Sequence, residues 1–167
     1  MPQTRQSVPE APQVGAAAPD FSLPVTGGGA FTLSQRFREG PVVVAFFPFA
    51  FSSTCTDELC TFTDDVEAYA EHGATVVGVS CDARYTLEAY AKAHGIRVPL
   101  ASDFDKRTAK AYGVLNPDHK GLGATARRSV FVVDPGGLVR YAWTTQDADD
   151  EPPYEEVLEA VARLSGG

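Results

Sequence analysis

The sequence of 167 residues lacks long hydrophobic segments. It has no run of 18 or more apolar residues, so we do not expect a transmembrane helix. Residues 1–13 are polar, carry three prolines, and lack the apolar stretch of a secretory signal. We therefore expect residues 1–14 to form a flexible N-terminal tail, residues 15–167 to form a single domain, and the protein to be cytoplasmic with no membrane partner.

Positive charge is also scarce. The chain has 14 Lys and Arg residues against 22 Asp and Glu residues, which gives a net charge of −8 at pH 7. Because such a chain repels the phosphates of nucleic acids, we expect no nucleic-acid partner. The hydrophobic fraction of 44% is normal for a globular protein, and a domain of this length can bury a substantial core.

Cysteine is limited to Cys55, Cys60 and Cys81. An odd number of cysteines in a chain that can build its own core is a poor disulfide framework, and it fits a reducing compartment better. The Cys-x-x-Cys pair that is typical of dithiol oxidoreductases is missing. Cysteines that matter in such a chain are catalytic, redox-active or metal-bound, and the others are small buried hydrophobes.

Patterns for metal and phosphate binding are missing too. His72, His94 and His119 are scattered, and no Cys or His pair has zinc-binding spacing. The three glycines at residues 27–29 predict a turn and no phosphate-binding loop, because no Lys-Ser/Thr pair and no helix follow them. We therefore expect no metal, no haem, no flavin and no other cofactor.

The apolar pattern alternates between strands and helices. Continuous β-branched and aromatic runs at residues 41–48 and 75–80 predict strands that are buried on both faces. Apolar residues recur at spacings of three and four from Leu59 to Tyr69, which predicts one amphipathic helix that begins near residues 53–56. The other predicted segments are strands at 21–24, 31–33, 98–101, 129–134 and 138–143, and helices at 85–94, 106–112 and 154–164.

This order of segments predicts an α/β fold. A mixed β-sheet should lie between helices, preceded by an N-terminal β-hairpin around the glycines at residues 27–29. A β-α-β unit followed by β-β-α is typical of the thioredoxin-like fold.

Cys55 lies just after a predicted buried strand and in the first turn of the predicted helix. The first four N–H groups of a helix have no partner inside it, and the helix dipole favours negative charge there. A thiol at this place ionises more readily, and the thiolate is the reactive form. The junction also lies at the carboxyl edge of the sheet, where α/β proteins place their sites. Cys55 is therefore the candidate nucleophile, with an inert core cysteine as the alternative.

The residues before Cys55 form a specific motif. Residues 48–55 read Pro-Phe-Ala-Phe-Ser-Ser-Thr-Cys and fit the pattern Pro-x-x-x-(Thr/Ser)-x-x-Cys. Here the sequence resembles the peroxiredoxin family, whose active-site loop carries this motif. The resemblance extends to Ala-Pro-Asp-Phe at residues 18–21 and to Arg-Ser-Val-Phe-Val-Val-Asp at residues 128–134, and it covers nearly the whole chain after the tail. It implies a thioredoxin-like fold and a thiol-dependent peroxidase.

The resemblance implies a role for each matched residue. Cys55 would supply the thiolate, Ser52 would form a hydrogen bond beside the sulfur and the peroxide, and Pro48 would wall the pocket. Ser52 is a departure, because most family members resemble Thr at this place. Arg128 would lower the pKa of the thiol and stabilise charge on the peroxide oxygen. Arg127 competes for this role, because alternate strand residues face opposite sides and only one of the two can point inward.

Three further side chains near Cys55 each have two interpretations. Glu58 follows Cys55 by one helical turn and either pairs with an arginine or is a solvated carboxylate on the helix surface. Phe49 and Phe51 either lie on an exposed loop face, which would suit a homodimer, or line the pocket.

Oxidation of Cys55 by a peroxide leaves a sulfenic acid, which condenses with a second thiol. Cys60 lies five residues on, which along a helix is a rise of ~7.5 Å and a rotation of ~500°. A disulfide needs Cα atoms within ~7 Å and converging Cβ vectors, so the first turns of the helix must unwind before the two can join. The Cys-x-x-x-x-Cys spacing resembles the PrxQ-type, bacterioferritin-comigratory branch, in which the second cysteine resolves the first. Cys81 is either a spectator or a backup resolving thiol.

Other features leave alternatives open. The aromatic stretch at residues 46–51 and the acidic C-terminal half also resemble the one-cysteine AhpE-like branch, in which an external thiol would resolve Cys55. A thioredoxin-like disulfide oxidoreductase and a binding module without turnover are the remaining alternatives. Our prediction is a peroxiredoxin that reduces hydrogen peroxide and alkyl hydroperoxides, takes electrons from thioredoxin or a similar dithiol protein, and is a monomer or homodimer.

Overall fold

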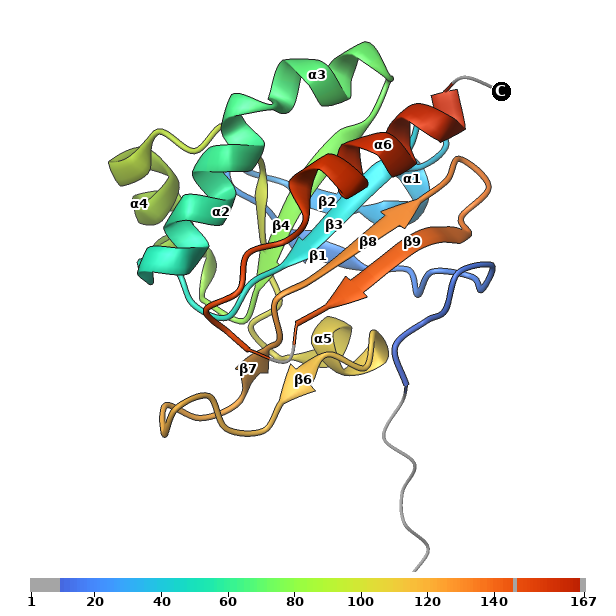
Figure 1. Cartoon of the computed structure of the whole chain (residues 1–167). Helices are drawn as coiled ribbons and strands as arrows, with labels where there is room; N and C mark the ends of the chain where they lie inside the picture. Colours follow the sequence, from blue (N-terminus) through green and yellow to red (C-terminus); the bar gives the residue numbers. More distant parts are fainter. Residues whose placement is uncertain (1–9, 146, 166–167) are drawn as a thin grey trace, which may run out of the picture.

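The structure, a computed structural model, describes residues 10–145 and 147–165. At its centre lies a five-stranded sheet in the order β5-β4-β3-β8-β9 (Figure 1). Strands β3, β4 and β5 are parallel to one another, whereas β8 is antiparallel to β3 and β9 is antiparallel to β8. The strands of this sheet are β3 (Val42–Phe46), β4 (Thr75–Ser80), β5 (Leu100–Ser102), β8 (Ser129–Val133) and β9 (Val139–Thr144).

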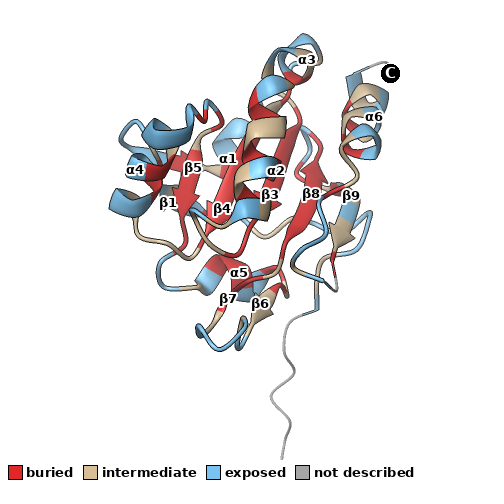
Figure 2. Ribbon diagram, turned by 60° about the vertical axis from the view of Figure 1, so that its left-hand side comes forward, coloured by how far each residue is buried: buried red, intermediate tan, exposed pale blue. Residues whose placement is uncertain are grey.

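The middle of this sheet is buried on both faces. All five residues of β3 are buried, and Val44 pairs with Val77 of β4 on one side and with Phe131 of β8 on the other. Figure 2 shows the strands β3, β4 and β8 in the colour of buried residues. The continuous apolar runs therefore mark central strands, as predicted.

Successive side chains of β3 point to opposite faces of the sheet, so the sheet separates two apolar cores. Val43 and Ala45 belong to the core beneath four helices: α2 (Ser53–Asp64), α3 (Val66–Glu71), α4 (Arg84–His94) and α6 (Tyr154–Ser165). Val42 and Val44 belong to the other core, which is covered by α1 (Leu33–Arg36), α5 (Arg107–Ala111) and the hairpin of β1 (Ser22–Pro24) and β2 (Ala30–Thr32). The predicted α/β architecture with a mixed sheet between helices is confirmed.

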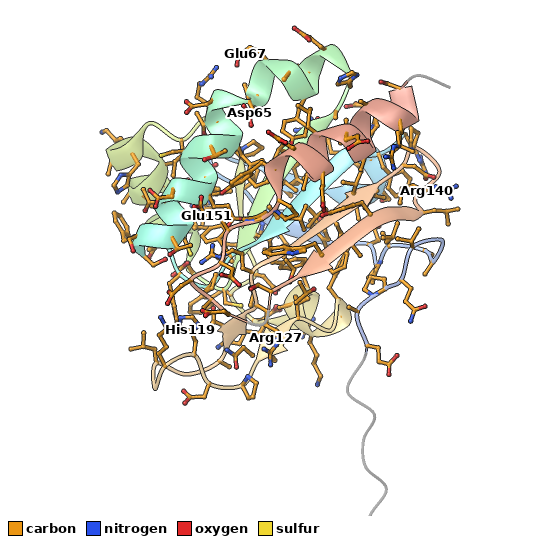
Figure 3. All side chains as sticks on the ribbon, in the orientation of Figure 1. Asp65, Glu67, His119, Arg127, Arg140 and Glu151 are labelled. Atoms are coloured by element: carbon orange, nitrogen blue, oxygen red, sulfur yellow. The ribbon has the colours of Figure 1, made fainter. Side chains whose placement is uncertain are left out.

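The prediction of one helix from about residue 53 to Tyr69 is wrong in one respect, because this segment forms two helices. Asp65, labelled in Figure 3, separates α2 from α3. Its backbone has φ −93° and ψ 3°. Asp has a low helix propensity, which makes such a break inexpensive. The break lets Tyr69 of α3 pack on Phe62 of α2, with ring centroids 6.1 Å apart.

Several short elements were not predicted. Helix α1 and the two-stranded ribbon of β6 (Leu115–Asn116) and β7 (Thr125–Ala126) are too short to show a periodic pattern. The predicted N-terminal hairpin is present, with Ser22 paired to Thr32, and so is the turn between β8 and β9, where Gly137 donates to the carbonyl of Asp134. The strand expected at residues 98–101 is Leu100–Ser102.

The predicted tail, residues 1–14, lies mostly outside the described residues. Ala11, near its described end, packs against the core that contains Val42 and Val44. Gly15, the first residue of the predicted domain, donates its N–H to the carbonyl of Val139 at 2.7 Å. Within residues 10–145 and 147–165, no helix is both long enough and apolar enough to cross a membrane.

Candidate active site

Cys55 is fully buried in the first turn of α2, directly after the loop that leaves β3. Asp82, which follows β4, fixes this loop: its Oδ2 accepts hydrogen bonds from the N–H of Ala50 and from the hydroxyl of Ser80, each at 2.8 Å. The next residue, Phe51, has φ +71°, a conformation that non-glycine residues rarely adopt. The entry into the helix is therefore held by an anchor outside the loop, as strained segments require.

Arg128 contacts Cys55 directly. Its two terminal nitrogens, Nη1 and Nη2, each lie 3.3 Å from the Cys55 sulfur. Nη1 also donates to Glu58 Oε2, and Nη2 donates to the carbonyl oxygen of Ala148 at 2.8 Å. Arg128 and Glu58 are 2% and 0% exposed, so this ion pair is buried. Of the two interpretations of Glu58, the structure shows the one that pairs it with an arginine.

Strand register brings Arg128 to Cys55. Ser129, the first residue of β8, pairs with Phe46, the last residue of β3, so Arg128 lies where the chain leaves β3 towards α2. Of the two competing arginines, Arg128 is the one that points inward: it is 2% exposed and contacts the Cys55 sulfur, whereas Arg127 is half-buried. Both residues lie between β7 and β8, and both contribute to the lining of one cavity.

Two acids compete for the charge of Arg128. Burial raises the pKa of the Cys55 thiol above its usual range, while Arg128, the Ser52 side chain and the Phe49 backbone act in the opposite direction. Burial also raises the pKa of Glu58 to about 7, again against the influence of Arg128. In the closed site, burial thus outweighs the combined influence of Arg128, Ser52 and Phe49 on the pKa of the Cys55 thiol. A charged Glu58 disfavours the thiolate of Cys55 by repulsion. When Glu58 is neutral, the positive charge of Arg128 can stabilise this thiolate.

Ser52 and Pro48 lie at the mouth of the site. Ser52 precedes α2, and its carbonyl accepts both the N–H of Thr56 at 3.0 Å and the Thr56 hydroxyl at 2.8 Å. The carbonyl of Pro48 accepts a hydrogen bond from the Thr125 hydroxyl, which ties the loop to β7. Both Ser52 and Pro48 line a cavity of about 120 Å³ beside the N-terminus of α2, together with Arg128.

The other two thiols are not in contact with Cys55 within the described part of the chain. All three cysteines are free. Cys60 is half-buried on the same unbroken helix, and burial together with Asp64 and Asp57 raises the pKa of its thiol. Cys81 follows β4, and burial and Asp103 raise its pKa to about 12.

The aromatic residues of the loop lie apart. Phe51 is 53% exposed and packs on Tyr90 of α4, with ring centroids 4.8 Å apart. Phe49 is half-buried and packs edge-on against His119, with centroids 5.4 Å apart. Among the described residues, neither phenylalanine lines the two cavities next to Arg128.

Several contacts of the site were missed in the sequence. The Tyr90 hydroxyl lies 2.9 Å from the Thr56 hydroxyl and joins the first turn of α2 to α4. His119 comes from the loop between β6 and β7, and Figure 3 shows it at the same end of the molecule as Arg127. The role of Asp82 could have been suspected from the sequence, because this residue follows a predicted buried strand at the carboxyl edge of the sheet. No sequence pattern points to Tyr90 or His119, since only folding brings these two residues close to the first turn of α2 and to the cavity beside it.

The site consists of a buried thiol at a helix start that accepts hydrogen bonds from a guanidinium at the edge of a mixed sheet. This arrangement is typical of a thiol-dependent redox enzyme. Residues 14–142 match the AhpC/TSA family. The chain belongs to this family of peroxiredoxins, and it is therefore a thiol-dependent peroxidase that acts on a peroxide and is recycled by a reductant.

Individual relatives point to the peroxiredoxin Q group. Chloroplastic peroxiredoxin Q of Triticum aestivum is 33% identical over 150 residues, which cover 90% of this chain and 67% of the wheat protein. The crystal structure of peroxidoxin BcpB from Mycobacterium tuberculosis superposes with a TM-score of 0.81 at 28% identity, covering 92% of this chain and 98% of that one. Peroxiredoxin Q of Xanthomonas campestris gives a TM-score of 0.78 at 26% identity, covering 92% and 97%. The predicted thioredoxin-like fold and the resemblance to peroxiredoxins are confirmed.

Proposed function

We propose that Cys55 is the residue that attacks the peroxide, and that hydrogen peroxide and organic hydroperoxides are its substrates. The thiolate attacks the terminal oxygen of R–O–O–H, an S–O bond forms, and the O–O bond breaks. The leaving RO⁻ takes up a proton as ROH, and Cys55 becomes a sulfenic acid. The contact of both Arg128 terminal nitrogens with the Cys55 sulfur is the observation that carries this proposal.

The neighbouring residues would divide the work. Arg128 stabilises the thiolate and then the negative charge that develops on the peroxide oxygens, because its donors are already fixed by Glu58 and Ala148. Ser52 lines the cavity through which a peroxide reaches Cys55, and its hydroxyl bonds the sulfur and the peroxide. Pro48 forms the wall between this cavity and the loop. The buried site keeps water away from the sulfur.

We further propose that Cys60 resolves the sulfenic acid by forming a disulfide with Cys55. Both lie on α2, so the first turns of this helix have to unwind. The turn that must open is held from outside the helix by the Tyr90 hydroxyl on Thr56. Thioredoxin or a similar dithiol protein then reduces the disulfide, in the cytoplasm, on a monomeric or homodimeric enzyme.

Intact-mass spectrometry of the peroxide-titrated protein tests both proposals. We expect wild type to lose two hydrogens through one disulfide, and peptide mapping to join Cys55 to Cys60. The Cys60→Ser variant should instead stop at a sulfenic acid on Cys55, trapped by dimedone. Cys81→Ser is the matched control and should behave as wild type. A Cys55→Ser variant that still consumes peroxide would rule out Cys55 as the attacking residue.

A second candidate is a one-cysteine cycle in which an external thiol resolves Cys55. The unbroken helix α2, which keeps the two thiols apart, favours it. In this case the oxidised wild type shows no Cys55–Cys60 peptide, and a small thiol added to it forms a mixed disulfide on Cys55.

A further inference from the structure

A second cavity, of about 140 Å³, adjoins the one beside Cys55. Both are lined by Pro48, His119, Lys120, Arg128 and Ala148, so they meet at the guanidinium that holds the Cys55 sulfur. The further residues that line only this second cavity are Asn116, Arg127 and Thr145.

Charge is distributed unusually around this second cavity. Its lining contains the cations Lys120, Arg127 and Arg128, and none of its described lining residues is acidic. The whole chain, by contrast, carries a net charge of −8. A local concentration of positive charge on an acidic protein favours the binding of an anion at this place.

Two of the three cations already have carboxylate partners. Arg128 pairs with Glu58, and Lys120 pairs with Asp149 at 3.2 Å. Arg127 forms no ion pair with any described residue, although its side chain is only half exposed.

The backbone of Arg127 is held on both sides of its Cα atom. Its N–H donates to the carbonyl of Val114 at 2.6 Å, and its carbonyl accepts the Ser129 hydroxyl at 3.0 Å. This fixed backbone holds the base of the Arg127 side chain beside the cavity, and a guanidinium can bind a planar anion with two parallel hydrogen bonds.

The uncharged lining residues suit the same ligand. The pKa of His119 is lowered by burial and by the charges of Lys120 and Arg128, so its ring is a neutral hydrogen-bonding group at neutral pH. Packing against Phe49 orients the ring. Asn116 adds an amide to the cavity wall.

We propose that this cavity is a carboxylate-binding subsite, and that the enzyme prefers compact hydroperoxides that carry a carboxylate a few bonds away from the –OOH group. The carboxylate binds to Arg127 in the second cavity while the peroxide reaches Cys55 past Arg128. This inference rests on the proposed role of Cys55 and names the substrate class of that same site. The chemistry is unchanged: the O–O bond breaks, Cys55 gains one oxygen, and the product is the hydroxy acid.

The size of the two cavities limits the substrate. About 140 Å³ and about 120 Å³ accommodate a short branched chain between the two functional groups. Two charge-assisted hydrogen bonds to one carboxylate correspond to a preference of about tenfold or more over an uncharged analogue.

The test compares a hydroperoxide of a short branched carboxylic acid with its own methyl ester. The rate constant of Cys55 oxidation is measured for both peroxides, and the acid-to-ester ratio within each variant cancels effects on folding and on the thiol itself. We expect a ratio of about ten or more in wild type and a ratio near one in Arg127→Gln. Arg163→Gln is the matched control, because it removes the same charge from the exposed end of α6 and should keep the wild-type ratio.

Three outcomes overturn the inference. A wild-type ratio near one, or an unchanged ratio in Arg127→Gln, removes the carboxylate subsite. The cavity binds a free anion instead if two results occur together. The wild-type acid-to-ester ratio is near one, and added acetate changes the rate for the ester in wild type but not in Arg127→Gln. Failure of hydrogen peroxide itself to oxidise Cys55 would overturn the proposed function, and this result is recognised separately from the ratio.

Discussion

Arg128 holds the Cys55 sulfur between its two terminal nitrogens, each 3.3 Å away, and the same guanidinium is hydrogen-bonded to the buried carboxylate of Glu58. A single cation therefore serves two acids that are both cut off from water. Whether the proton lies on Cys55 or on Glu58 decides how much of the positive charge faces the sulfur.

Replacing Arg128 by Lys should slow the oxidation of Cys55 by about 100-fold or more, because an ammonium keeps the charge but cannot reach sulfur and carboxylate with a fixed fork. Stopped-flow fluorescence of Trp143, the one tryptophan of the chain, can follow the reaction. Arg163→Lys on the exposed end of α6 is the control and should react like wild type. An Arg128→Lys rate within a few-fold of wild type would contradict the role of the guanidinium.

Glu58 should make the protein less stable as the pH rises. Its pKa in the folded state is about 7, above the ordinary value of 4.5, so the folded protein binds the proton more tightly than the unfolded chain does. This contribution is fully present below pH ~4.5 and is lost as the pH rises through ~7, a change of about 3 kcal/mol in the free energy of unfolding.

Urea denaturation at several pH values measures this effect in wild type and in Glu58→Gln. The difference between the two unfolding free energies should fall by about 3 kcal/mol from pH ~4.5 to pH ~8. Glu39→Gln, which changes an exposed carboxylate, should track wild type at every pH. A constant difference between wild type and Glu58→Gln would show that Glu58 keeps an ordinary pKa.

Tyr90→Phe should open the first turn of α2 more easily. The variant loses the hydroxyl that contacts Thr56 at 2.9 Å but keeps the ring on which Phe51 packs. One net hydrogen bond amounts to about 1 kcal/mol, so a disulfide between Cys55 and Cys60 should form about fivefold faster once Cys55 is oxidised. Timed acid quenching with mass spectrometry gives this rate, and Tyr85→Phe, at an exposed residue of α4, is the control. Slower disulfide formation in Tyr90→Phe would argue against unwinding of this turn.

Gly78→Ala should destabilise the protein by about 1–3 kcal/mol through overpacking. A Cβ at this residue of β4 would lie 2.8 Å from Leu100 Cδ2 and 3.2 Å from both Leu59 Cδ2 and Phe47 Cε1. Leu59 belongs to α2, so the glycine permits the close approach of this helix to the sheet. Urea denaturation should show a lower midpoint with an unchanged slope. Adding Leu100→Val should recover part of the loss, and strict additivity of the two changes would contradict this contact.

Features that are local in the sequence could be predicted from it. The apolar run that contains β3 shows a buried strand in its own composition, and the motif from Pro48 to Cys55 lies within eight residues. The helix start follows from the same segment. Fold class, candidate nucleophile and family resemblance therefore needed no knowledge of distant contacts.

Features that depend on distant partners could not be predicted. Glu58 has the sequence pattern of a solvated helix residue, and only Arg128, 70 residues away, explains its burial. The cavity beside Arg127 is also formed by residues from distant segments, such as Asn116 and Thr145, which strand alternation near Ser129 does not reveal. The break at Asp65 goes with the packing of Tyr69 on Phe62, which the spacing of apolar residues does not reveal.

The buried side chains of Leu59 and Phe62 limit how far α2 can unwind. Helix unwinding spreads cooperatively along an unbroken helix, because each hydrogen-bonded turn supports the next. If α2 frays from Ser53 during each catalytic cycle, fraying that reached Leu59 would have to expose a fully buried side chain, so the unwinding is limited to the turns before α3. Leu59 and Phe62 stay in the core as a template, so rewinding after reduction extends an existing helix and avoids the slow formation of a new one.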